Sequence, residues 1–144
     1  TAVRDPGNAG SVIRVADAAG AHGVVMSSDS VDLFNPKVVR ASVGSIFHLP
    51  IAVGQELAQT IVAAREAGMQ VLAADANGVS LYGGVDLAKP TVWVFGNEAW
   101  GIPAEVLELV DAVVSIPIYG QAESLNLATA SAVCLYASAQ AQNA

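Results

Sequence analysis

The feature of this sequence that most restricts its fold is a regular alternation between short apolar runs and longer segments with helical periodicity. The apolar runs are mostly rich in β-branched residues and are bounded by Gly, Pro or Asn, as buried strands often are. Such alternation is typical of an α/β domain in which helices cover a mostly parallel sheet. We therefore predict an α/β fold. Strands are expected at residues 23–26, 45–49, 70–74, 91–95 and 112–116, with a further strand ending near Val3.

The helical segments are marked by their end signals. Gly20 and Gly68 are placed as C-terminal stops, and Pro103 stands at a helix start. Helices are expected at residues 9–19, 55–67, 104–110 and 125 to about 140, and another opens at 36–39. The C-terminal helix, from residue 125 to about 140, carries no charge, so we expect it in the core or, failing that, in a subunit interface. Its expected apolar face consists of Leu125, Ala128, Ala132, Leu135 and Ala139.

Composition excludes several classes of protein. A length of 144 residues suits one domain, and 53 % hydrophobic against 13 % charged residues excludes disorder. The single Cys134 cannot form an internal disulfide, and no cysteine or histidine cluster offers metal ligands, so we expect no metal and a reducing, cytoplasmic compartment. The longest uncharged stretch, residues 124–144, is interrupted by amide and hydroxyl side chains, so no membrane association is expected.

The charge distribution limits how this chain can bind nucleic acid. Its formal net charge is −7, all six basic residues lie at or before Lys89, and the last third is acidic. Phosphate neutralisation supplies most of the non-specific affinity for nucleic acid. Any RNA-binding role therefore requires a basic accessory domain or a protein partner.

Two common nucleotide-binding motifs are missing. No GxGxxG follows an expected strand, which argues against dinucleotide binding. The glycines of residues 96–101 have the spacing of a phosphate-binding loop, but Ile102 stands where the required lysine belongs. A plain nucleotide-binding α/β domain without an RNA role stays open as an alternative.

Three polar, glycine-containing segments each follow an expected strand. They span residues 8–14, 95–101 and 116–126. Ligands of open α/β sheets gather beyond the carboxyl ends of the strands. We therefore expect the three segments to form one composite site.

These segments resemble the three motifs of the SpoU (TrmH) family of RNA ribose methyltransferases, within the SPOUT superfamily. Residues 5–14 resemble the first motif, residues 95–98 with Gly101 the second, and residues 116–126 the third. Either a Gly-Asn-Glu or a Ser-Leu-Asn alone means little, since each could be a turn or a helix cap. All three in order are specific, and the chain, 1–144, is identified as one catalytic domain of this kind.

The resemblance implies transfer of a methyl group from S-adenosylmethionine to the ribose 2'-hydroxyl of a nucleotide in ribosomal RNA or tRNA, without a metal. It also implies a deep trefoil knot near the C-terminus, whose threaded backbone forms the cofactor pocket, and an obligate homodimer. Family members commonly have an RNA-binding N-terminal domain, so we expect one upstream that is missing here. A non-catalytic module that binds cofactor or RNA is the alternative.

Matching to the family assigns catalytic roles to Arg14, Asn8, Glu98, Ser124 and Asn126. Because arginine stays protonated, we expect Arg14 to clamp a substrate phosphate and orient the ribose, with direct proton abstraction left open. Asn8 also suits the N-cap of the first helix, and Ser124 and Asn126 suit that of the last. Glu98 either orients the arginine or the ribose, or accepts backbone amides in its own turn.

The resemblance also implies main-chain contacts to the cofactor. They are expected near Gly96, Ile116 and Leu125, at Leu72, Ala73 and Ala74, and in the loop that follows Ala74. Alternatively, Gly96 and Gly120 are glycines only because a turn requires backbone dihedral angles that other residues rarely adopt. Trp100 departs from the small or polar residues expected at its position and has no assigned role, and Cys134 is interpreted as a buried hydrophobe.

Overall fold

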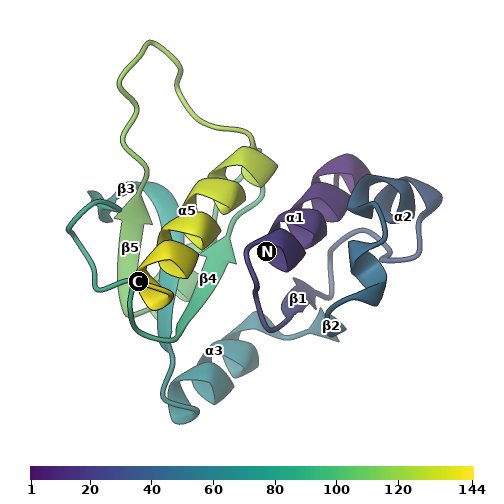
Figure 1. Cartoon of the computed structure of the whole chain (residues 1–144), viewed down its shortest axis with the longest axis horizontal. Coiled ribbons are helices and arrows are strands. Elements are labelled where there is room, and N and C mark those ends of the chain that lie inside the picture. Colours follow the sequence, from purple (N-terminus) through teal and green to yellow (C-terminus); the bar gives the residue numbers. More distant parts are fainter.

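The strands form two small parallel sheets with helices around them, in a computed structural model that describes residues 1–144 (Figure 1). One sheet pairs β1 (Val24–Ser27) with β2 (Ile51–Gln55). The other has the order β4-β3-β5, made of β3 (Gln70–Ser80), β4 (Thr91–Phe95) and β5 (Ala112–Ser115). All of these pairings are parallel. The predicted α/β class is confirmed, but the strands are divided between two sheets.

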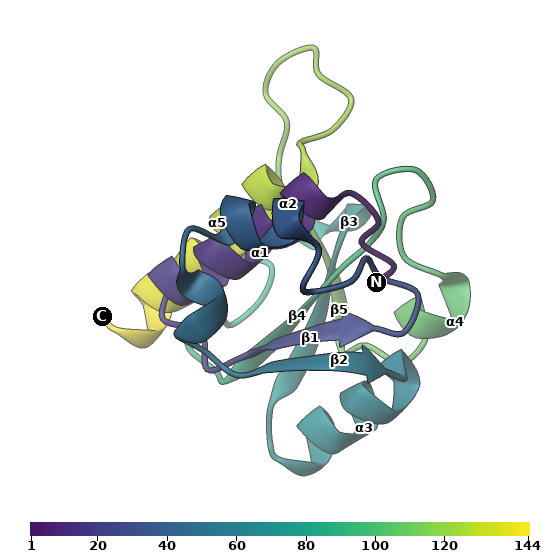
Figure 2. The same ribbon diagram turned by 90° about the vertical axis from the view of Figure 1, so that its right-hand side faces the viewer.

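Five α-helices surround the sheets: α1 (Pro6–Ala18), α2 (Pro36–Ser42), α3 (Leu57–Glu66), α4 (Ala104–Leu107) and α5 (Leu127–Gln142). A short 3-10 helix, η1, covers Ser45–Phe47. Helix α1 packs against both α2 and α5, and lies between them (Figure 1; Figure 2 shows the same three helices from the side of α2). This arrangement brings the first helix beside the last one. None of the helices combines the length and hydropathy of a membrane-spanning segment.

The predicted strand at residues 45–49 is wrong, because η1 occupies this apolar run. Val43 and Gly44 both adopt left-handed backbone conformations, with φ of 49° and 85°, and so turn the chain into the 3-10 helix. The strand begins only at Ile51. The strand predicted to end near Val3 is wrong too: Val3 accepts one backbone hydrogen bond from Val31 but lies in irregular structure.

Strand β3 extends past its predicted end and bulges on the way. Its register against β5 shifts between Ala74 and Val79, both of which lie opposite Val114. A Cβ atom at Gly78 would lie 2.4 Å from the carbonyl carbon of Val113, so only glycine fits this close approach. At the bulge, residues 75–78 leave the regular pairing with β5, and Asp75 and Ala76 line a pocket there.

Helix α5 begins at a side-chain cap. The Oδ1 of Asn126 accepts hydrogen bonds from the amides of Ala128 (2.9 Å) and Thr129 (3.3 Å). The residues of the expected apolar face are only half-buried, and the helix instead buries the residues one position before Ala128, Ala132, Leu135 and Ala139. Serine and cysteine are small enough for close packing, and Trp93 Nε1 donates to Ser138 Oγ at 2.9 Å. The buried residues are Leu127, Ser131, Cys134 and Ser138.

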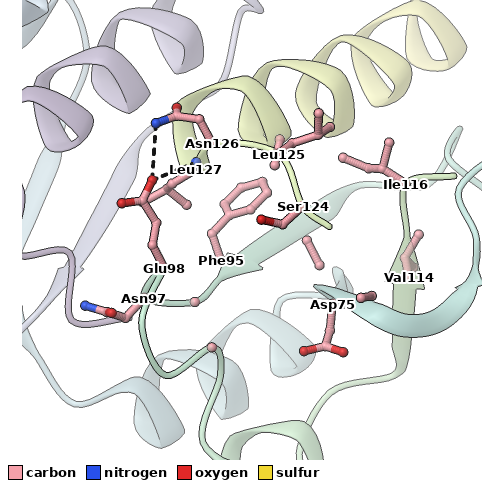
Figure 3. Close-up of a pocket in the computed structure, with 15 residues that line it drawn as sticks. Asp75, Phe95, Asn97, Glu98, Val114, Ile116, Ser124, Leu125, Asn126 and Leu127 are labelled. Atoms are coloured by element: carbon pink, nitrogen blue, oxygen red, sulfur yellow. Dashed lines mark hydrogen bonds between the residues drawn. The ribbon is translucent and has the colours of Figure 1, made fainter. Parts of the chain in front are cut away.

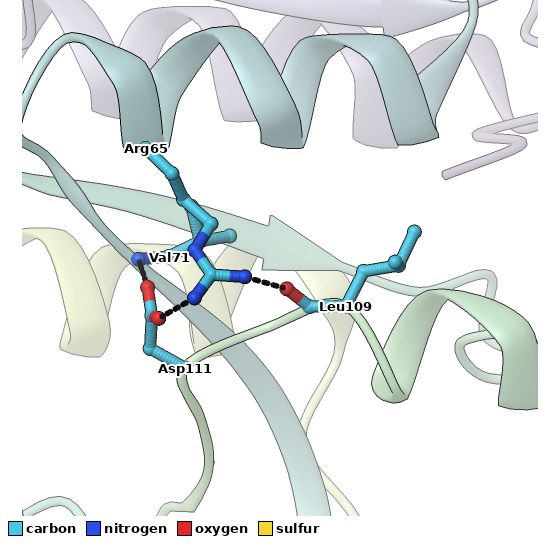
Figure 4. Close-up of polar contacts among 4 residues, drawn as sticks. All are labelled: Arg65, Val71, Leu109 and Asp111. Carbon is cyan, nitrogen blue, oxygen red and sulfur yellow. Dashed lines mark hydrogen bonds and ion pairs between the residues drawn. The ribbon is translucent and has the colours of Figure 1, made fainter.

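Helix α3 is tied to the three-stranded sheet through Asp111 (Figure 4). Its residue Arg65 contacts Asp111 Oδ1 at 3.2 Å and donates to the carbonyl oxygen of Leu109 at 3.4 Å. The other carboxylate oxygen of Asp111 accepts the amide of Val71 at 2.7 Å. A single carboxylate thus joins α3, the start of β5 and the buried start of β3.

Candidate functional site

A pocket of about 350 Å³ lies at the carboxyl ends of β4 and β5 and at the bulge of β3 (Figure 3). Its walls come from residues 74–76 of β3, from the loop after β4, and from β5 with the segment that leads into α5. Two of the three segments singled out in the sequence meet here. Their position beyond parallel strands is the usual ligand position in an α/β fold.

A carboxylate and two amides connect all three segments. Glu98 Oε1 accepts hydrogen bonds from Asn126 Nδ2 and from the amide of Leu127, both at 3.2 Å (Figure 3). Asn126 Nδ2 also donates to Asn8 Oδ1 at 3.1 Å. Glu98 therefore serves the first turn of α5 and not its own turn. The positive end of a helix dipole favours a carboxylate at this place.

The loop after β4 is held in a narrow turn. Asn97 and Gly101 exchange backbone hydrogen bonds of 3.1 and 2.7 Å, and Asn97 Oδ1 accepts the amide of Ala99 at 2.7 Å. A Cβ atom at Gly96 would lie 2.4 Å from the carbonyl carbon of Gly101, so Gly96 is required for close approach and not for its dihedrals. Gly120 shows neither requirement.

The first segment reaches the site through Asn8 alone. Asp5 caps α1 by accepting the amide of Asn8 at 2.6 Å, so Asn8 is not the N-cap and its side chain is free to bond Asn126. Arg14 lies further along α1, exposed to solvent, forms no ion pair and does not line the pocket. The structure thus brings Asn8 to the site but leaves Arg14 outside it.

Four of the six residues expected near the cofactor line the pocket: Ala74, Gly96, Ile116 and Leu125. Leu72 and Ala73 do not, because both are fully buried in the core beneath it. Asp75, the first residue after Ala74, also lines the pocket, but sequence reasoning expected only main-chain contacts there and did not single out its carboxylate. A carboxylate that follows a buried strand was the available signal.

The pocket is acidic. It contains the carboxylates of Asp75 and Glu98, while Lys, Arg and His are absent from its lining. Such a lining favours a cationic ligand and disfavours the phosphates of a nucleotide. No cluster of His, Cys, Asp and Glu side chains in the chain could hold a metal ion.

Comparison with known proteins agrees with this geometry. The sequence profile of the SpoU rRNA Methylase family matches residues 1–136. The chain belongs to this family. The profile spans all three segments described above, so the similarity includes the site as well as the scaffold.

Curated relatives of this SpoU family chain are RNA methyltransferases. It is 38 % identical over 135 residues to a 23S rRNA (guanosine(2553)-2'-O)-methyltransferase of Bacillus subtilis, covering 94 % of this chain and 54 % of that protein. It is 40 % identical over 136 residues to a 23S rRNA (uridine(2479)-2'-O)-methyltransferase of Streptomyces viridochromogenes, covering 91 % and 47 %. The chain therefore spans about half the length of these relatives.

Solved structures show the same fold. The SpoU methyltransferase AviRb of Streptomyces viridochromogenes, in complex with the cofactor AdoMet, superposes with a TM-score of 0.85 at 38 % identity, over 95 % of this chain and 56 % of that one. A structure described for 2-OH methylation of C/U34 on tRNA gives a TM-score of 0.85 at 32 % identity, over 99 % and 91 %. The parallel α/β architecture is thus that of SPOUT methyltransferases.

Proposed function

We propose that this domain transfers a methyl group from S-adenosylmethionine to the ribose 2'-hydroxyl of a nucleotide in ribosomal RNA or tRNA. The observation that carries the proposal is the hydrogen-bonded group of Asn8, Glu98 and Asn126, which joins all three motif segments beside an acidic pocket. The names of the curated relatives support the same chemistry.

The residues of the pocket fit S-adenosylmethionine. This cofactor carries a sulfonium cation and, when bound, supplies an electrophilic methyl group. The carboxylates of Asp75 and Glu98 give the pocket the complementary charge. Main-chain groups at Ala74, Gly96 and Leu125 would hold the adenosine and methionine parts, and backbone recognition explains why these side chains are small or apolar.

The polar rim would position the RNA. Alignment of the hydroxyl for in-line attack is the main task of a protein in such a transfer. Ser124 precedes α5 and lines the pocket, so its hydroxyl would contact the substrate ribose. The amides of the first turn of α5 are already bonded to Glu98 and Asn126. The guanidinium of Arg14 is exposed and forms no ion pair, so it would clamp a phosphate of the incoming strand.

We further propose that the C-terminal segment forms a deep trefoil knot and that the domain is a homodimer. The family match and the superposition on a SpoU methyltransferase support the knot, which the family resemblance implies. Helix α5 carries no charged residue and leaves Tyr136 53 % exposed, which suits contact with a second copy. Sedimentation that shows only a folded, cofactor-competent monomer would contradict the dimer.

An upstream RNA-binding domain completes the proposal. The chain spans only about half of its curated relatives, and its net charge of −7 provides little attraction for RNA. A protein extended at its N-terminus should bind substrate RNA more tightly than this domain does. Equal affinity of the two proteins would remove this part of the proposal.

Calorimetric titration with S-adenosylmethionine and its demethylated product tests the proposed function. We expect saturable binding of both, and no binding of an adenine dinucleotide, whose phosphates meet two carboxylates. Failure of the folded dimer to bind S-adenosylmethionine would exclude catalysis by this domain. Saturable binding without methylation of any ribosomal RNA or tRNA transcript by the extended protein would favour the non-catalytic module.

A further inference from the structure

An exposed indole stands beside the site without a role in it. Trp100 is 69 % exposed and does not line the pocket, although it lies only two residues after Glu98. The guanidinium carbon of Arg4 lies 4.8 Å from the centroid of its ring. Trp93 differs, since it is half-buried and donates its indole N–H to Ser138. The position of Trp100 is therefore not explained by core packing.

Both partners of this pair project from backbone that is fixed. The loop of Trp100 is closed by the two hydrogen bonds between Asn97 and Gly101, and Asn97 Nδ2 donates to the carbonyl oxygen of Ala2 at 2.8 Å. The segment that carries Arg4 is held on one side by Val31, whose amide donates to Val3 at 2.8 Å. On its other side Asp5 caps α1. The two side chains thus form a preorganised unit.

We propose that Trp100 and Arg4 form a platform on which a base of the RNA substrate stacks, next to the nucleotide that is methylated. Exposed aromatic rings and guanidinium planes are the groups on which unpaired bases stack. Arg4 forms no ion pair, so its N–H groups are available to a phosphate of the same strand. This inference rests on the proposed function, because the platform serves the delivery of a ribose to the site.

The distribution of charge favours this partner. The acidic pocket itself repels phosphate, so the strand must be attracted from beside it. Basic residues concentrate in the segment before α1, in α1 and in α2, whereas the chain beyond Lys89 has none. A strand that follows this basic side would present a base to Trp100. The four basic residues of this part are Arg4, Arg14, Lys37 and Arg40.

Fluorescence provides a direct test of stacking. A single-stranded oligoribonucleotide of mixed sequence should quench Trp100 in a saturable manner, because a stacked base contacts the ring face. The W100F variant retains Trp93 and should lose this quenching. Inorganic polyphosphate of equal charge has no bases and should not quench the wild-type protein.

Kinetics with transcribed substrate RNA and the N-terminally extended protein test the effect on the reaction. Trp100→Ala should raise the KM for RNA about 10-fold, as expected for the loss of one stacked base, and Trp100→Phe should restore most of the affinity. Arg4→Ala should raise the same KM by a smaller factor. Affinity for S-adenosylmethionine should change less than about twofold in each variant. Lys89→Ala, which removes a positive charge at the opposite end of β4, serves as the control.

The outcomes separate this inference from the proposed function. Normal methyl transfer by Trp100→Ala with an unchanged KM, or methylation by wild type without quenching, overturns the platform and leaves the proposed function intact. Dissociation of a wild-type dimer by Trp100→Ala would place the indole in a subunit interface and also overturn the platform. If wild type neither binds S-adenosylmethionine nor methylates RNA, the proposed function fails, and the platform with it.

Discussion

Glu98 Oε1 accepts a hydrogen bond from Asn126 Nδ2 at 3.2 Å, although the two residues stand 28 positions apart in the chain. The same oxygen accepts the amide of Leu127, so the loop after β4 holds the first turn of α5 in place. Asn126 in turn caps that helix with its own Oδ1. Each of the two side chains therefore depends on the other for its position beside the pocket.

Two replacements of Glu98 should distinguish the effect of its negative charge from the effect of its hydrogen bonds to α5. Glu98→Ala removes the acceptor of two hydrogen bonds and the negative charge, and we expect methyl transfer to fall about 100-fold. Glu98→Gln keeps a carbonyl acceptor, so it should retain more activity and the wild-type thermal stability. Single-turnover methyl transfer and thermal unfolding of both variants provide the measurements. Equal activity of wild type and Glu98→Ala would exclude a role for this carboxylate.

Arg14 should be needed for turnover and not for the cofactor. Arg14→Ala is expected to abolish methyl transfer by the extended protein while the Kd of S-adenosylmethionine stays within a few fold, because Arg14 lies outside the pocket. Lys89→Ala is a matched loss of one positive charge and should be active. Radiolabelled methyl transfer and calorimetry report the two quantities. Turnover retained by Arg14→Ala would exclude its assignment to catalysis.

Asp111 should contribute more to stability than its ion-pair partner. Asp111→Ala leaves the amide of Val71, a residue with 0 % exposure, without its acceptor, and should cost about 1–3 kcal/mol of unfolding free energy. Arg65→Ala breaks an ion pair whose arginine side chain is 54 % exposed, and should cost less than about 1 kcal/mol. Urea unfolding of both variants measures the difference. The reverse order would show that the ion pair is the stronger of the two contacts.

Cys134 should make the protein sensitive to alkali. Burial raises the pKa of this thiol from 9.0 to about 12. The unfolded chain therefore loses the thiol proton first, so its contribution to stability is complete below about pH 9 and is lost as the pH rises toward 12. The slope is at most about 1.4 kcal/mol per pH unit. Unfolding free energies of wild type and Cys134→Ala should diverge only above about pH 9, and parallel curves would contradict a buried thiol.

Local signals located most elements. β4 lies at residues 91–95, as predicted, and Gly20 and Gly68 follow their helices with φ of 75° and 79°. These signals work because β-branched runs and left-handed glycines act within a few residues. The apolar run at 45–49 carried the same local pattern as a strand. Val43 and Gly44, which precede this run, adopt left-handed conformations and turn the chain into the 3-10 helix. Hydrophobic periodicity does not reveal such backbone conformations.

The α/β class and the three polar segments could be predicted from residue type and order alone. Four residues that line the pocket were expected there only from the resemblance to a known family. The folded chain determines which side chains meet. It joined Asn8 to Asn126 across 118 positions, brought Asp75 to the pocket and left Arg14 outside it. It also buried Leu127, Ser131, Cys134 and Ser138 of α5 instead of the expected apolar face. Long-range packing selects among faces and registers that are equivalent in local energy, and no short stretch of sequence contains that information.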